Sequence, residues 1–250
     1  ILIKNNLQIN NLILVIKKIY KLTFMKKIFI TAIILTLGIF KTSVSKELID
    51  LKFIEMEVLR NGDVIGFSNY KFSKENNFLK VENETKFKVD VLGVNLFKID
   101  SLGIEFYENN KLVSFESETF QNKKVKYVNL KLSEDKTQYL INGSSYKGSA
   151  ALNNVIGNWW NYQILQTDTQ ISPLSGSIKK QEVKYIGDEL IKILDRKIET
   201  KKFSLKSKNQ NLPEDKKLDF IIWIDPSTNI ILKVAYERMG RWEYKLKKYN

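Results

Sequence analysis

Alternation of apolar and polar residues is the dominant pattern in this chain. It runs through residues 54–58, 79–91, 230–237 and 241–247, with charged residues filling the intervening positions. A period of two places successive side chains on opposite faces of a β-strand, so each stretch predicts a strand with one buried and one solvated face. The apolar positions expected to face the core include Leu79, Val81, Val89, Ile222, Leu232, Val234 and Leu246.

Short turn signals separate these stretches. They are Asn61-Gly62-Asp63, Asn76-Asn77, Glu108-Asn109-Asn110, Gln121-Asn122-Lys123, Ser133-Glu134-Asp135, Gly187-Asp188, Asp225-Pro226-Ser227 and Met239-Gly240. Asn, Asp and Gly favour the tight turns that join antiparallel strands. About ten or eleven strands joined in this way predict an antiparallel meander, and a sheet of that size is expected to curl or close.

One segment interrupts the alternation, from Gly148 to Gly176. Within it, Trp159, Tyr162, Ile164 and Leu165 are spaced to line one side of a short helix. Long connections in compact domains tend to carry function or to plug a core. We therefore predict an all-β fold: a strongly curved antiparallel meander or incomplete barrel, crossed on its open side by a partly helical segment at about 148–176.

The stretch that begins at Met25 has the three parts of a secretory signal peptide. Lys26 and Lys27 precede an apolar run over 28–40, and small residues stand at Ser43 and Ser45. The run is shorter than the roughly 20 residues that span a bilayer. We predict cleavage after Ser45 and export, with a periplasmic location and membrane contact only through the signal peptide. An uncleaved anchor is the alternative.

Residues 1–24 contain no Met and no acidic residue. Two interpretations are open: upstream codons translated into the chain, or a second amphipathic membrane segment. The first is preferred. The expected organisation is therefore a non-native extension over 1–24, a signal peptide over 25–45, and a single exported β domain over 46–250.

The net charge of +13 overstates the basicity of the β domain. Seven of the 41 Lys and Arg residues lie within 1–45, so residues 46–250 carry 34 basic against 28 acidic residues, a net charge of +6. These charges alternate along strands, whereas nucleic-acid binding favours a clustered basic face. We expect no nucleic-acid partner.

The chain contains no Cys and no His. This composition excludes disulfides, thiol nucleophiles, zinc sites built from Cys or His, and His-based triads. The carboxylate pairs Glu55/Glu57, Glu82/Glu84 and Glu116/Glu118 are two residues apart, so each pair is expected on the solvated face of a strand. We predict a protein that is not an enzyme and that uses no metal or cofactor.

Trp159, Trp160, Asn161 and Tyr162 are the candidate ligand-binding residues. Adjacent tryptophans point to different sides of any element, so one can be buried while the other faces a cavity. An aromatic wall for an apolar or sugar ligand is one interpretation. The other is that both tryptophans plug an open end of the sheet.

Three motifs resemble a bacterial exported family catalogued as domain of unknown function 6134. They are "VLRNGDVIG" at 58–66, Trp160-Asn161 followed by "ILQTDTQISPLSG", and the run from Ile221 to Leu246. The resemblance covers most of 51–249. This chain has Trp159 where the family's "TSHWN" loop has His, and 173–176 departs from the family's D-T-x-x-G. The layout is also similar to another exported family of unknown function and to periplasmic lipoprotein carriers, whose curved sheet holds acyl chains.

Two functions remain open. In the first, the protein shelters a lipid or other apolar small molecule in the concave face of its sheet, as the resemblance to carriers implies. In the second, it is an envelope structural or interaction protein with a packed interior. The aromatics that could supply that bulk are Phe53, Phe87, Phe97, Phe106, Phe220, Trp223 and Trp242. Neither the ligand nor the oligomeric state follows from the sequence.

Overall fold

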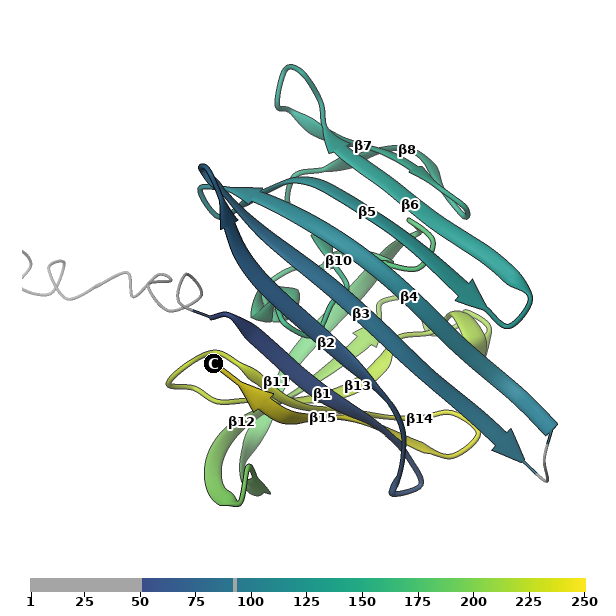
Figure 1. Cartoon of the computed structure of the whole chain (residues 1–250), viewed down its shortest axis with the longest axis vertical. Helices are drawn as coiled ribbons and strands as arrows, with labels where there is room; N and C mark the ends of the chain where they lie inside the picture. The colour runs from purple at the N-terminus through teal and green to yellow at the C-terminus, as the bar shows by residue number, and fades with distance from the viewer. Residues whose placement is uncertain (1–50, 92–93) are drawn as a thin grey trace, which may run out of the picture. The chain divides into compact units, whose positions relative to one another are not determined.

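A computed structural model describes residues 51–91 and 94–250, which form fifteen strands of one sheet and two short 3₁₀ helices (Figure 1). The first eight strands are β1 (Phe53–Arg60), β2 (Asp63–Glu75), β3 (Phe78–Val91), β4 (Val94–Glu108), β5 (Lys111–Gln121), β6 (Lys124–Leu132), β7 (Gln138–Gly143) and β8 (Lys147–Ala151). The remaining elements are β9 (Val155–Ile156), η1 (Tyr162–Leu165), β10 (Thr169–Ile171), β11 (Ile178–Ile193), β12 (Arg196–Ser207), η2 (Glu214–Lys216), β13 (Asp219–Ile224), β14 (Ile231–Glu237) and β15 (Arg241–Tyr249). The count exceeds the ten or eleven strands predicted.

The sheet is a meander in which the first and last strands of the chain pair with one another in the middle of the strand order. Strands β1 to β8 pair in sequence on one side, strands β9 to β15 pair in sequence on the other, and β1 pairs with β15. Every pairing is antiparallel except that of β9 with β10. The sheet is not closed, because β8 and β9 are its two edges. The predicted all-β incomplete barrel is therefore confirmed.

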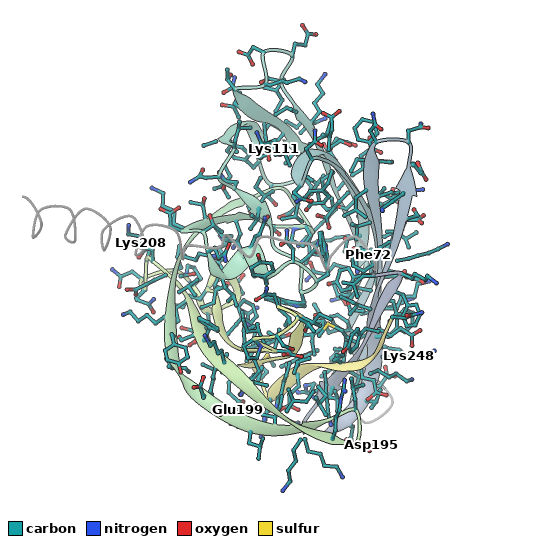
Figure 2. The ribbon with its side chains drawn as sticks, turned by 90° about the vertical axis from the view of Figure 1, so that its left-hand side faces the viewer. Phe72, Lys111, Asp195, Glu199, Lys208 and Lys248 are labelled. Atoms are coloured by element: carbon teal, nitrogen blue, oxygen red, sulfur yellow. The ribbon has the colours of Figure 1, made fainter. Side chains whose placement is uncertain are left out.

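The curvature of the sheet follows from its connections. Only residues 152–154 separate β8 from β9, although these strands lie at opposite ends of the strand order. Three linking residues span at most about 14 Å, so the edges must approach one another. Figure 2 shows the hairpin β11–β12 curling beneath the molecule, from Lys208 to Asp195 at its tip. The side of β11–β12 that faces β1–β8 is the concave face.

The core lies inside this curve. The predicted core positions Val81, Val89, Ile222, Leu232, Val234 and Leu246 are all buried, and Leu79 packs against the core while partly exposed. The carboxylate pairs lie on the outer face, where several join lysines, as in the Glu84–Lys86 ion pair at 2.8 Å. Both outcomes agree with the period-two pattern, because burial follows the side of the strand on which a residue stands.

The segment Gly148–Gly176 (hereafter the crossing segment) contains a short helix, η1, as predicted, together with part of β8, β9 and β10. One local prediction is wrong. Gly187-Asp188 is not a turn. It is a register shift within the continuous strand β11, and the hairpin turn lies at Leu194 and Asp195, which both have positive φ. The φ of +131° at Gly187 suits a bulge as well as a turn, so composition alone did not separate the two.

Strand β4 presents an apolar side chain outward and a carboxylate inward. Leu102 is 58 % exposed, whereas Glu105 is only 1 % exposed and faces the core. Phe106 accordingly lies on the outer face, against Phe78 at a centroid distance of 6.5 Å. Three of the seven aromatics named as potential core filling, Phe53, Phe106 and Trp223, therefore do not fill the concave face. Lysines stack over two of them, Phe53 and Trp223.

The predicted extension, signal peptide and Ser45 cleavage site lie outside the described residues. They remain predictions. In the part of the chain that is described, no helix has the length and apolar character needed to cross a membrane.

Candidate functional site

The four predicted ligand-binding residues occupy different surroundings in the crossing segment. Trp160 is buried, with its ring edge-on to Phe72 and to Tyr107 at centroid distances of 5.4 and 5.5 Å. Trp159 is half-buried against Phe220, 5.0 Å away. The side chains of the two adjacent tryptophans therefore point to different sides of the crossing segment, as predicted for neighbouring residues.

Asn161 and Tyr162 belong to the short helix η1. The Asn161 side-chain oxygen accepts a hydrogen bond from the backbone N–H of Gln163 at 3.0 Å, which caps the helix. Tyr162 is the first helical residue and is half-buried. The four residues do not converge on one site.

A buried carboxylate that the sequence did not single out holds the crossing segment to the sheet. Glu105 Oε1 accepts hydrogen bonds from Asn158 Nδ2 at 2.5 Å and from Trp160 Nε1 at 2.9 Å. Glu105 Oε2 accepts one from the Tyr107 hydroxyl at 2.5 Å. Burial raises the pKa of Glu105, and the three hydrogen bonds act in the opposite direction. A carboxylate with every contact made inside the protein serves as an anchor.

Two cavities flank the crossing segment. The first, which we name the Trp159 cavity, has a volume of about 250 Å³. Its interior is lined by the polar residues Ser68, Tyr70, Asn83, Thr85, Ser101, Asn158 and Gln170, and by Phe87, Ile99, Trp159, Leu174, Phe220 and Tyr244. Lys179, Asp215, Lys216, Lys217 and Arg238 line the end at which the cavity meets the surface, and we name this end the mouth.

Most of the polar groups in the Trp159 cavity are paired with neighbours. The hydroxyls of Ser68 and Thr85 are 2.7 Å apart, and those of Ser101 and Thr119 are 2.6 Å apart. The Tyr70 hydroxyl accepts the backbone N–H of Trp159 at 3.2 Å, and burial raises the pKa of Tyr70 to about 12. The tyrosine is thus neutral at physiological pH. The cavity wall is uncharged away from the mouth.

The second cavity, which we name the edge cavity, lies between the tip of the β4–β5 hairpin and the crossing segment. Its volume is about 690 Å³. Asn161 lines it, together with Tyr107, Tyr139 and the side chains of residues 152–154. Trp160 and Tyr162 line neither this cavity nor the Trp159 cavity. Of the four predicted residues, one therefore contributes to each cavity.

Metal ligation has no support in the described ranges, 51–91 and 94–250, since they contain no group of three or more acidic residues placed to hold an ion. No local feature of the sequence indicates that Glu105 is buried. The apolar residues at 102, 104 and 106 are typical of the opposite orientation of β4, in which Glu105 would lie on the outer face.

Comparison with known proteins places the fold. A family model described as "Domain of unknown function (DUF6134)" matches residues 56–247. The chain is also similar to a solved beta-barrel-like protein of domain of unknown function DUF1849 from Brucella abortus, with a TM-score of 0.55 and 10 % sequence identity. That similarity covers 80 % of this chain and 97 % of the Brucella protein, and at such low identity it concerns the fold alone. No curated protein matches the sequence.

Proposed function

This chain belongs to the DUF6134 family, and we propose that it is an exported, non-enzymatic protein that binds a small apolar or lipid-like ligand in the Trp159 cavity. The cavity itself carries the proposal. It lies in the concave face of the curved sheet, reaches the surface, and has Trp159 in its wall. Ligand sites are typically concave and largely apolar, with a few polar groups that fix orientation.

The distribution of aromatic side chains supports an interior that is not completely filled. Phe87, Phe97 and Trp242 pack together at one end of the sheet. Phe53, Phe106 and Trp223 lie on the outer face. Beside Trp159 the rings of Tyr70, Phe87, Phe220 and Tyr244 line the cavity, and they leave a volume of about 250 Å³ unfilled.

The size and polarity of the cavity limit the class of ligand that it can bind. A volume of about 250 Å³ lies at the small end of the roughly 300–1,000 Å³ that is usual for ligand pockets. The cavity is lined both by hydroxyl and amide groups and by aromatic rings. We therefore expect a small molecule with an apolar body and at least one hydrogen-bonding group.

The non-enzymatic part of the proposal rests on the cavity's chemistry. His and Cys do not occur in the sequence. Glu105, a buried acid beside the crossing segment, lines neither cavity and already accepts three hydrogen bonds. General acid–base catalysis requires a titratable group within hydrogen-bond reach of the substrate. Tyr70 and Tyr244 line the cavity, but burial raises the pKa of each hydroxyl, and the other titratable side chains of the lining lie at the mouth.

A fluorescent neutral probe tests the proposal directly. N-phenyl-1-naphthylamine brightens in apolar surroundings, and we expect the purified domain to bind it with saturable fluorescence. Leu174 lines the Trp159 cavity, so Leu174→Trp should fill it and weaken binding about tenfold or more. The matched control is Leu152→Trp, which places the same side chain in the edge cavity and should leave binding unchanged.

Three other outcomes would change the conclusion. Loss of binding in Leu152→Trp alone would move the ligand site to the edge cavity. Equal binding in both variants would point to the protein's outer surface. No binding by the folded wild type would favour the alternative, an envelope structural or interaction protein. Native mass spectrometry of protein purified from the cell envelope provides a second readout, in which a co-purified small molecule is expected.

A further inference from the structure

The mouth of the Trp159 cavity is ringed by cations. Lys179 projects from β11, Arg238 follows β14, and Lys216 and Lys217 lie at the end of η2. Asp215 is the acidic residue among the mouth residues. Elements far apart in the sequence thus bring positive charge to the mouth of a cavity whose interior wall is uncharged.

The protein's own backbone orients two of these cations. Lys179 Nζ donates to the carbonyl of Lys216 at 3.0 Å. One terminal nitrogen of the Arg238 guanidinium, Nη2, donates to the carbonyls of Glu214 and Lys217 at 2.9 and 3.1 Å. Both side chains are therefore fixed against the same short loop.

Each of these cations retains unused hydrogen-bond donors. An ammonium has three N–H donors and a guanidinium has five. The protein engages one N–H of Lys179 and the two on Nη2 of Arg238. The remaining donors find no acceptor within the described parts of the chain, and a forked guanidinium beside an ammonium matches the oxygens of a carboxylate, sulfonate or phosphate.

The protein neutralises the charge of this cluster only in part. Lys217 pairs with Glu214 at 2.5 Å, whereas neither Lys179 nor Arg238 forms an ion pair with a carboxylate among residues 51–91 and 94–250. Partial burial, followed by the proximity of Arg238 and Lys216, lowers the pKa of Lys179, while Asp215 acts weakly in the other direction. An anion at the mouth would relieve this repulsion.

We propose that the ligand is an anionic amphiphile whose acidic group binds Lys179 and Arg238 while its apolar body enters the cavity beside Trp159. The inference rests on the proposed function and specifies the ligand's chemistry. It also accounts for the partition of the site into a charged mouth, an aromatic wall and a neutral interior.

A matched pair of dyes tests the binding cavity and the anionic nature of the ligand separately. N-phenyl-1-naphthylamine and 8-anilino-1-naphthalenesulfonate share one skeleton and differ by the sulfonate. At fixed ionic strength we expect the anionic dye to bind about tenfold more tightly, since charge-assisted hydrogen bonds outweigh neutral ones. The double variant Lys179→Gln with Arg238→Gln should remove that advantage, so that the two dyes bind equally well.

Lys180→Gln is the control for net charge. Lys180 follows Lys179 on β11, so its side chain points to the opposite face of the strand, where it is exposed. It should leave both affinities within twofold of the wild type. Inorganic phosphate at the dye's concentration should not displace the anionic dye, because phosphate lacks the apolar body.

Distinct results would overturn each idea. Equal affinities for the two dyes, or an unchanged anionic-dye affinity in the double variant, would refute the anionic ligand while leaving the cavity proposal intact. An equal loss in Lys180→Gln would assign the effect to overall charge. Displacement by phosphate alone would reduce the mouth to a simple anion site. Failure of both dyes to bind would remove the proposed function itself.

Discussion

The Glu105 anchor yields the sharpest prediction, because one substitution removes three interior hydrogen bonds. Glu105→Ala deletes the acceptor shared by Asn158, Trp160 and Tyr107. Two of these bonds attach β4 to the crossing segment, from residues 53 and 55 positions further along the chain, and the third, from Tyr107, lies within β4. The substitution therefore tests whether a polar cluster or apolar packing alone fixes that segment in the concave face.

The expected magnitude follows from the surroundings of each donor. A buried donor left without a partner costs about 1–3 kcal/mol. Asn158 lines the Trp159 cavity and Tyr107 lines the edge cavity, so water can reach both and their costs fall at the lower end of that range. Trp160 lines neither cavity and is 3 % exposed, so its cost falls at the upper end. Loss of a desolvated carboxylate offsets part of the sum. We expect a net loss of about 3 kcal/mol.

Urea unfolding followed by tryptophan fluorescence measures this loss. With a slope of about 2–3 kcal/mol per molar for a domain of this size, the midpoint should fall by roughly 1–1.5 M. Glu105→Gln is the informative partner variant. Its Oε1 still accepts from Asn158 and Trp160, and its amide can donate to the Tyr107 hydroxyl, so its stability should stay within about 1 kcal/mol of the wild type at pH 7.

Glu116→Ala on the neighbouring strand β5 is the control for a surface carboxylate. Glu116 is exposed, and its loss should change stability by no more than about 0.5 kcal/mol. The reasoning fails if Glu105→Ala lies within about 1 kcal/mol of the wild type at an unchanged slope. It also fails if Glu105→Gln is as unstable as Glu105→Ala, since negative charge rather than acceptor geometry would then hold the segment.

Three further predictions concern pH, backbone contact and processing. Burial raises the pKa of Glu105 in the folded state, so folding takes up a proton. The wild type should therefore gain stability relative to Glu105→Gln as the pH falls from 8 towards the unfolded pKa of about 4.3, and a loss of wild-type stability relative to Glu105→Gln on acidification would contradict this. Gly66→Ala should destabilise the domain by roughly 2–4 kcal/mol in thermal unfolding, because its Cβ would overlap the Lys86 carbonyl. Gly103→Ala is the control: its Cβ would meet Phe115 at 3.3 Å, and it should cost less than about 1 kcal/mol. Equal losses in the two variants would argue against the contact with the Lys86 carbonyl. N-terminal sequencing of the protein from the envelope fraction should begin at Lys46, and an intact Met25 would refute export by cleavage.

Much of the fold is written in local sequence, because a strand's two faces and its turns depend on neighbouring residues. Val81 and Val89 on β3 and Leu246 on β15 are buried where alternation places them. The turns at Asn61-Gly62, Asn109-Asn110 and Met239-Gly240 have the positive φ that their residues favour. Two of the family's three motifs, at 58–66 and 221–246, lie on such strands and turns, and the third lies in the crossing segment. The all-β class therefore followed from the sequence alone.

The strand order of the sheet and the placement of the site depended on contacts between distant residues. Nothing local indicates that β1 pairs with β15, which brings together strands at opposite ends of the domain. Glu105 faces inward although Ile104 and Phe106 beside it are apolar, because donors from 158 and 160 meet it there. In the sequence, Lys179 and Arg238 resemble ordinary surface cations. In the structure, both side chains donate hydrogen bonds to carbonyls of the loop at 214–217, which places them at one cavity mouth. Hydrophobic periodicity reports the side on which a residue stands, whereas hydrogen-bond partners and charge neighbours are set by the tertiary fold.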